Sequence, residues 1–341
     1  MPLTRIQPAA IADTRGVNFR NIIINGDMSI AQRGTSFTGL GNGDTKYTLD
    51  RFKFNESGAT TGEMTVSQST DVPSGQGFTK SVKFDCTTAD TTLGSDDLIY
   101  FNQRIEGQNL QYLNYGTSSA KKVTLSFWVK SNISGSVFAA NLYNEDNLRI
   151  VNTNFSLSSA DTWEKKTFII DGDTVSGFNN DTDKSLYLAF TLGAGSAWSD
   201  GTASTTWTDY KGRDETDSNW AAGIEANLLS STDNELYITG IQLEADAVTD
   251  FEFLPFDVNA NRCKRYYQKS YEIGTDPGTS TTSGSYNLAR TQNTVTNRST
   301  EGLRFTPSMR TAPTVTVYTL TGVAGSVSDT GTSAGTHSRS E

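Results

Sequence analysis

Carboxylates are the groups in this sequence that could do acid–base chemistry. The chain has one histidine, His337, and two cysteines, Cys86 and Cys263, which argues against a Ser-His-Asp or Cys-His nucleophile and against a Cys/His zinc site. A glycoside hydrolase needs two carboxyl groups about 5–10 Å apart across a sugar. The candidates for such a pair are Asp50, Glu106, Glu164 and Glu244. Most acidic residues of a β-sandwich are solvated on outward positions, so we expect no enzymatic activity.

One long polar segment, Gly193–Gly223, carries three of the five tryptophans of the chain and Tyr210. Loops of this length inside a compact domain are usually functional or bound to something. Aromatic faces can stack on the apolar faces of sugars, and nearby polar groups can bond to sugar hydroxyls. The candidate glycan-binding residues are Trp198, Trp207, Tyr210, Trp220, Asp200, Asp209 and Lys211. The alternative is that these rings cover an edge of the fold or pack at a subunit interface.

The charge balance disfavours nucleic acid as a partner. Lys plus Arg number 28 and Asp plus Glu number 38, which gives a net charge of −10. A basic run lies in 257–268, where Asp257 or Asn259 could cap a short helix. We interpret that run as a solvated helix face that pairs with acidic neighbours. No secretory signal and no apolar run long enough to cross a bilayer is visible, so we expect reduced cysteines and no membrane insertion.

Short segments with a period of two dominate the chain from about residue 22 to 256. In Val123–Val129 this alternation places Phe127 inward and Trp128 outward. Leu188, Phe190 and Ile238 are further expected core residues. The other expected strands are Tyr47–Phe54, Glu63–Gln68, Lys80–Asp85, Leu98–Ile105, Ser136–Leu142, Glu164–Ile170, Leu186–Leu192 and Leu236–Leu243. About ten short antiparallel strands separated by turns predict an all-β jelly-roll sandwich.

Composition divides the chain into four segments. Residues 1–20 are polar and irregular and predict an extended arm, residues 21–256 the jelly roll, and residues 257–268 a helical hinge. Residues 269–341 predict a small second β domain with a polar tail. Its expected strands are Lys269–Ile273, Gly284–Arg290, Leu303–Phe305 and Thr314–Leu320. A domain this small must complete its core on a partner or leave its tail disordered, and this thin core together with the unpaired arm predicts a homo-oligomer.

Six sequence blocks follow one another along the chain: Asn21–Met28 with Ala31–Arg33, Tyr47–Phe52, Val123–Lys130, Thr162–Lys165, Leu236–Glu244 and Arg262–Lys269. Together, and in this order, they resemble a family of bacteriophage virion proteins, usually tail fibres or related appendages. The resemblance covers roughly residues 18 to 318. It implies a jelly-roll domain like that of carbohydrate-binding modules, a homotrimer and a virion location after synthesis in the host cytoplasm. The N-terminal arm would attach the chain to other virion proteins.

The same resemblance bears on metal binding. Jelly-roll binding modules often hold a structural Ca²⁺ between their first and last strands, so Asp27 and Glu244 become candidate ligands. The alternative is that Glu244 pairs with Arg33 or Arg51. No other cofactor is expected.

These observations lead to a non-enzymatic tail fibre or appendage subunit that contacts host-surface glycans. The alternatives are a head decoration, head fibre or tail adaptor protein without sugar binding and, with least support, a polysaccharide depolymerase. The host, the glycan and the place on the particle do not follow from the sequence.

Overall fold

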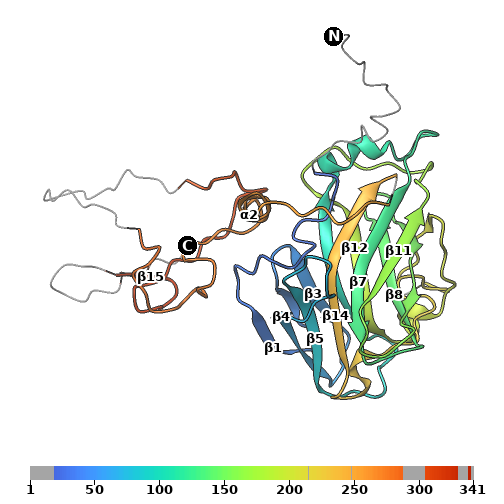
Figure 1. Ribbon diagram of the computed structural model, residues 1–341, viewed down its shortest axis with the longest axis horizontal. Helices are drawn as coiled ribbons and strands as arrows, with labels where there is room; N and C mark the ends of the chain where they lie inside the picture. Colours follow the sequence, from blue (N-terminus) through green and yellow to red (C-terminus); the bar gives the residue numbers. More distant parts are fainter. Residues whose placement is uncertain (1–18, 214, 247, 287–303, 329–336, 339–341) are drawn as a thin grey trace, which may run out of the picture.

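The computed structural model describes residues 19–213, 215–246, 248–286 and 304–328, together with the backbone of 337–338. Two antiparallel sheets lie face to face, with the two ends of the described chain outside them (Figure 1). The predicted all-β jelly-roll sandwich is confirmed. In the described ranges no helix is long and apolar enough to pass through a lipid bilayer.

The two sheets contain strands from the whole length of the sandwich. In order across the six-stranded sheet these are β1 (Ser36–Leu40), β4 (Glu63–Ser69), β5 (Ser81–Thr88), β14 (Glu235–Ala245), β7 (Val123–Ser131) and β11 (Glu164–Ile170). The eight-stranded sheet runs β13 (Thr208–Asp209), β9 (Arg149–Asn152), β8 (Val137–Asn144), β12 (Lys184–Ala194), β6 (Leu98–Glu106), β3 (Phe52–Ser57) and β2 (Thr45–Tyr47), with β10 (Phe155–Ser156) beside β8.

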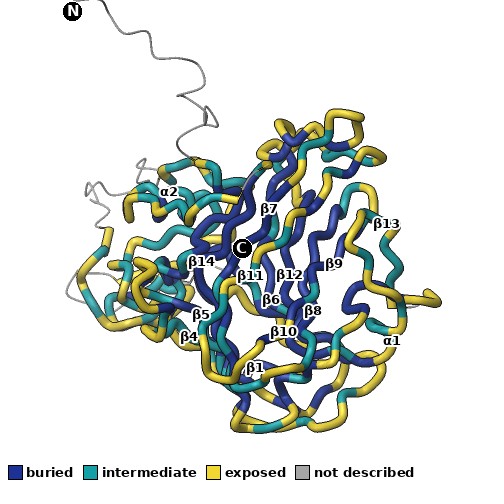
Figure 2. The backbone as a smooth tube through the Cα atoms, turned by 45° about the vertical axis from the view of Figure 1, so that its right-hand side comes forward, coloured by how far each residue is buried: buried dark blue, intermediate teal, exposed yellow. Residues whose placement is uncertain are grey.

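The core lies between the sheets and is rich in phenylalanine. Phe127 on β7 and Phe190 on β12 are 0% and 1% exposed, and their ring centroids are 5.0 Å apart across the interface. Leu188 and Ile238 are also fully buried, so the predicted register is confirmed. Trp128 points to the outer face of the six-stranded sheet, where it lies between Lys165 and Thr239. Figure 2 shows burial concentrated in the paired strands and exposure in the connecting loops.

One expected strand is two strands. The segment Tyr47–Phe54 contains the end of β2, a turn and the start of β3. The turn is closed by hydrogen bonds between Thr48 and Phe52 and from the Phe52 amide to the Leu49 carbonyl. Arg51 has a φ of 74°, which a continuous strand does not permit. The short strands β1, β9, β10 and β13 had no clear alternation and were not expected.

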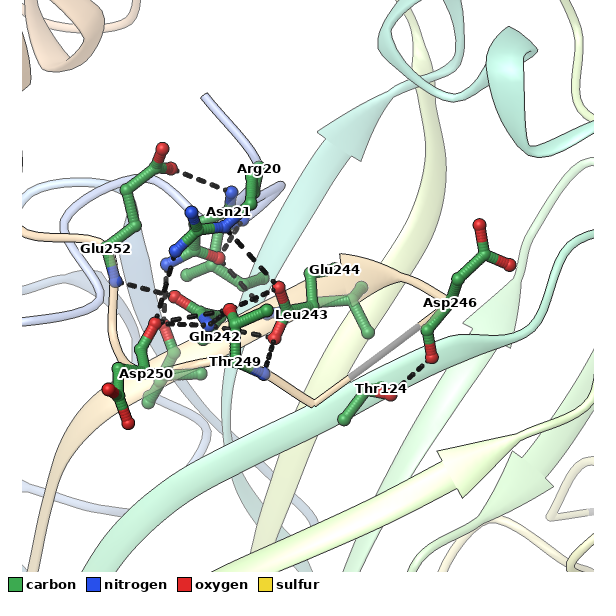
Figure 3. Close-up of polar contacts among 12 residues, drawn as sticks. Arg20, Asn21, Thr124, Gln242, Leu243, Glu244, Asp246, Thr249, Asp250 and Glu252 are labelled. Carbon is green, nitrogen blue, oxygen red and sulfur yellow. Dashed lines mark hydrogen bonds and ion pairs between the residues drawn. The ribbon is translucent and has the colours of Figure 1, made fainter. Parts of the chain in front are cut away.

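The N-terminal segment is fixed to the end of β14 by Asn21 (Figure 3). The Asn21 side chain accepts a hydrogen bond from the Leu243 amide at 3.1 Å and donates one to the Ile241 carbonyl at 3.0 Å. The Asn21 amide donates to the carboxylate of Glu252 at 2.9 Å. The chain therefore enters and leaves the sandwich at the same place, which puts the helix that follows beside it.

That helix, α2 (Phe256–Lys264), begins after Pro255, and no side chain caps it. The predicted caps Asp257 and Asn259 are wrong, because both residues lie inside the helix. Asn259 instead accepts a hydrogen bond from the Asn25 amide and donates one to Asp27. The helix N-terminus is thus used for docking on the sandwich.

A buried carboxylate holds the end of α2. Glu106, at the end of β6, receives hydrogen bonds from Arg265 Nε and Nη2 at 2.8 and 2.7 Å and from the Tyr266 hydroxyl. Arg51 stacks on the Tyr266 ring with its Cζ 3.4 Å from the centroid. Arg265 therefore pairs with an acidic residue of the sandwich, as predicted for the basic run, but it lies after α2 and its partner is buried, so the contact is not on a solvated helix face.

Beyond α2 the described chain has little regular structure. β15 (Ser326–Val327) pairs with β16 (His337–Ser338), and Tyr318 makes one isolated bridge with Ala324. The expected strands Lys269–Ile273 and Thr314–Leu320 are not strands. The expected strands Gly284–Arg290 and Leu303–Phe305 lie partly outside the described residues, as do most of the arm and the polar tail. The division into four segments stays a prediction.

Candidate functional site

The aromatic-rich loop folds back over the outer face of the eight-stranded sheet. It contains the short helix α1 (Ser196–Ser199) and β13, which pairs with β9. Trp220 is 5% exposed, with its ring centroid 5.3 Å from Tyr100 and 5.5 Å from Tyr143. The Asn141 side chain donates a hydrogen bond to the Trp220 carbonyl at 2.6 Å. Trp220 therefore packs the loop onto the sheet.

The structure brings only some of the predicted rings together. Tyr210 lies 4.8 Å from Tyr143 and 6.0 Å from Trp220, between ring centroids, and Trp198 packs against the same buried cluster. Trp207 packs elsewhere, against Tyr115 at 5.7 Å, with the main core. The four predicted rings thus do not form one surface, and their role as glycan contacts stays a prediction.

The three predicted polar contacts each have a partner within the chain. Asp200 accepts a hydrogen bond from the Ser218 amide at 2.7 Å. Asp209 accepts one from Arg149 at 2.7 Å, and Lys211 pairs with Asp217 at 3.3 Å. These pairs order the loop locally. Each of the three side chains has a different partner, and their role as glycan contacts stays a prediction.

A second set of residues lies on the same outer face, next to the aromatic-rich loop, whose Trp220 packs against one of them, Tyr100. Phe52 and Phe54 on β3 are buried in the core, so Lys53 between them faces outward. Residues on the same side of the neighbouring strands β2, β6 and β12 face outward with it. We call the six outward residues the cationic tyrosine face: Tyr47, Lys53, Tyr100, Arg104, Lys184 and Tyr187. The register supports this grouping, since Tyr47 lies opposite Lys53, and Arg104 lies opposite Tyr187.

Tyr187 is at the centre of the polar contacts on this face. Arg104 lies over its ring, 4.7 Å from Cζ to centroid. Its hydroxyl donates to Glu145 at 2.9 Å and accepts from Lys184 at 3.0 Å, and Lys184 also pairs with Glu145. Burial raises the pKa of Tyr187 above its ordinary value, so the hydroxyl remains a hydrogen-bond donor at neutral pH.

Within the described part of the chain, the other two cations of the face have no acidic partner. Among the described residues, neither Lys53 nor Arg104 has a carboxylate within ion-pair distance, and Arg104 Nε is buried without a hydrogen bond. Burial, followed by the like charges of Arg104 and Lys184, lowers the pKa of Lys53. Burial also raises the pKa of Tyr100, against the opposing effect of Arg104. The face therefore holds an excess of positive charge.

Sequence reasoning did not single out these residues, although a signal for them exists. In β6, LIYFNQRIE, alternation places Tyr100, Asn102 and Arg104 on one face, and the buried Phe101 fixes which face is outward. Their grouping with Tyr47 and Tyr187 depends on strand order, which the sequence does not state.

The candidate metal ligands lie among protein partners, and Figure 3 shows those of Glu244. Glu244 accepts hydrogen bonds from the Thr249 amide and hydroxyl at 3.0 and 2.7 Å and pairs with Arg20 at 3.7 Å. Asp27 accepts one from the Ser29 hydroxyl at 3.0 Å. Within the described ranges no three His, Cys, Asp or Glu side chains are arranged to hold a metal. The calcium site stays a prediction. The expected ion pair of Glu244 with Arg33 or Arg51 is wrong, because Glu244 pairs with Arg20 instead.

The remaining candidate acids are also engaged. Asp50 accepts hydrogen bonds from the Gln32 amide and side chain, both at 2.6 Å, and burial raises its pKa. Glu106 binds Arg265, and Glu164 pairs with Lys166 at 2.7 Å. Each carboxylate has a role in holding the fold. Cys86 and Cys263 are both buried and unbridged.

No family model matches the sequence, and no curated protein sequence matches it. Solved structures with similar folds include the enzymatically active domain of tailspike protein 4 of bacteriophage CBA120, with 10% identity and a TM-score of 0.34. That match covers 67% of this chain and 22% of the tailspike chain.

Two smaller proteins match over nearly their whole length. A CBM4 structure has 15% identity and a TM-score of 0.31, and the match covers 65% of this chain and 98% of the CBM4 chain. A putative sugar-binding protein from Bacteroides thetaiotaomicron has 12% identity and a TM-score of 0.34. That match covers 66% of this chain and 100% of the other chain. At these TM-scores the similarities support no assignment of function to this chain.

Proposed function

We propose that this chain is a non-enzymatic subunit of a bacteriophage tail fibre or related appendage, and that its cationic tyrosine face contacts glycans of the host surface. The observation that carries the proposal is the face itself. Three tyrosines and three cations lie on the outer side of four neighbouring strands, beside the aromatic-rich loop.

The chemistry of this face suits a hydrated polymer. Tyrosine offers a flat apolar ring for a sugar face and a hydroxyl for its polar groups. Tyr47 is 41% exposed, and Tyr100 lies half-buried beside the loop. The strands hold both rings on a rigid support, which lowers the entropy that binding must overcome. A single site of this kind binds weakly, so several copies on one particle would raise the avidity.

The virion assignment rests on the sequence resemblance. The same resemblance implies a homotrimer, attachment through residues 1–20 to other virion proteins, and a location on the particle. These are parts of the proposal, and the contacts within the single chain support only its binding face.

A structural virion component without sugar binding is the second candidate. The observation that favours it is that Trp220 and Trp207 use their rings inside the chain. A head decoration, head fibre or tail adaptor would need such a rigid sandwich and no ligand. A depolymerase has least support, because the acids proposed for it hold protein groups.

A glycan array probed with the full chain tests the proposal. We expect binding that Tyr47→Ala and Tyr100→Ala weaken, while Trp163→Ala, on the outer face of the other sheet, leaves it unchanged. Circular dichroism melting of all variants separates lost contacts from lost folding. Failure of the correctly folded chain to bind any glycan would favour the structural component, and release of reducing ends would favour the depolymerase.

A further inference from the structure

Resting on the proposed function, we propose that the ligand of the cationic tyrosine face is an acidic polysaccharide, whose sugar carboxylates are bound by Arg104 and Lys53.

The cationic tyrosine face is complementary in charge to an anionic ligand. The chain carries a net charge of −10, yet this face combines Lys53, Arg104 and Lys184. Glu145 pairs with Lys184, and the other two cations have no carboxylate partner in the described part of the chain. Like charges brought together without counterions destabilise a fold, so a face of this kind gains most from an anionic ligand.

Geometry assigns different roles to the three cations. Lys184 is held by Glu145 and by the Tyr187 hydroxyl, so it fixes the ring below Arg104. With the ring on one side, the guanidinium has a defined plane, and a planar guanidinium can donate two parallel hydrogen bonds to a carboxylate. The ammonium group of Lys53, on the neighbouring strand β3, is a compact charge that can bind a carboxylate from a wider range of directions.

The same face fits a polysaccharide better than a nucleic acid. Duplex DNA carries one negative charge per about 1.7 Å, and binding it draws on many cations. A polysaccharide with one carboxylate per sugar has a lower charge density, so two unpaired cations can match it while the acidic remainder of the chain repels it less. Tyr47 and Tyr100 would then contact the sugar rings between the acidic groups.

Matched polymers give a direct test. Calorimetric titration of the full chain would use polygalacturonate, alginate and hyaluronan, each also after chemical reduction of its carboxyl groups to alcohols. We expect at least one acidic polymer to bind about tenfold or more tightly than its reduced form, with an affinity that falls as salt rises. Equal affinity for both forms would overturn this inference and leave the proposed function standing. Binding to no glycan, on the array or here, would remove both.

Variants and a competitor complete the test. Arg104→Gln and Lys53→Gln should each weaken binding to the acidic polymer about tenfold, a larger loss than for the reduced form. Lys165→Gln is the matched control, because it removes one charge from the outer face of the other sheet. Losses of the same size from Lys165→Gln would contradict the assignment to this face. Equal competition by single-stranded DNA of similar length would show a general anion surface and overturn the polysaccharide.

Discussion

The guanidinium of Arg104 lies over the ring of Tyr187, with 4.7 Å between its Cζ and the ring centroid. The two residues are direct partners across β6 and β12, so the sheet register itself creates this contact. A cation over an aromatic face is stabilised by about 0.5–1 kcal/mol at an exposed site and more when desolvated. The pair therefore holds a fixed positive charge on the outer side of the sheet.

Removing the Tyr187 hydroxyl should measure how firmly this arrangement is held. Tyr187→Phe keeps the ring under Arg104 but removes the bonds to Glu145 and Lys184. We expect the free energy of unfolding to fall by about 1 kcal/mol in urea denaturation. Tyr47→Phe is the control, since its hydroxyl makes no hydrogen bond to the described residues, and it should cost nothing measurable. A Tyr187→Phe protein as stable as the parent would show that these bonds are replaced by water.

Trp220 should behave as a packing residue. Its ring is 5% exposed and contacts three tyrosines, so Trp220→Ala should destabilise the sandwich by about 3–5 kcal/mol. Tyr47→Ala, at a residue that is 41% exposed, should leave the melting temperature nearly unchanged. If Trp220→Ala instead kept the parent melting temperature and lost glycan binding, the ring would be a ligand contact and the loop would be part of the site.

Neighbouring residues on β7 test the register of the core. Phe127→Ala should cost about 3–5 kcal/mol, because the ring is fully buried between the sheets. Trp128→Ala should cost clearly less, since Trp128 lies half-buried on the outer face. Chemical denaturation of both variants gives the comparison. The reverse order of losses would place the strand one residue out of register.

The contact between α2 and the sandwich should depend on pH through Glu106. Burial alone would raise the pKa of Glu106, but hydrogen bonds from Arg265 and Tyr266 and the charge of Arg265 bring it below its ordinary value of 4.5. A carboxylate with a lowered folded pKa contributes stability above its ordinary pKa and loses it as pH falls through the folded value. Glu106→Gln should therefore cost about 2 kcal/mol at pH 7.

The difference between the parent and Glu106→Gln should shrink as pH falls below 4.5, because both then carry an uncharged group at this position. Urea unfolding at several pH values measures it. Asp209→Asn, whose carboxylate is 86% exposed, should show little difference at any pH. A Glu106→Gln loss that stayed constant down to pH 3 would mean that the ionised form of Glu106 does not hold α2.

Strands with strict alternation were predictable from the sequence. Glu164–Ile170 matches β11, and Leu98–Ile105 and Val123–Val129 each fall within one observed strand, because a buried face imposes a period of two on the residue types. The period of two gives no signal in a strand whose residues are buried on both faces, or in a strand that is very short. The turn at Arg51 had no glycine to reveal it, and β9 and β13 pair only because the aromatic-rich loop brings them together.

The site was less predictable than the fold. Composition identified the aromatic loop, but only the packing shows that Trp220 is buried against Tyr143. Sequence separation gave no reason to associate Tyr47 with Tyr187, which come together through the strand order β2–β3–β6–β12. For the same reason, the partner of Glu244 is Arg20, which the return of the N-terminal segment to the end of β14 places beside it.

Hydroxyl-radical footprinting with and without bound glycan tests the central claim most directly, because it reports which rings a ligand covers. The full chain would be labelled alone and with a glycan that the array identifies, and oxidation of each aromatic residue would be measured by mass spectrometry. We predict that oxidation of Tyr47 and Tyr100 falls when the glycan binds, while oxidation of Trp128 and Trp163, on the outer face of the other sheet, stays the same. Protection of Trp128 and Trp163 with Tyr47 and Tyr100 unchanged would contradict the account.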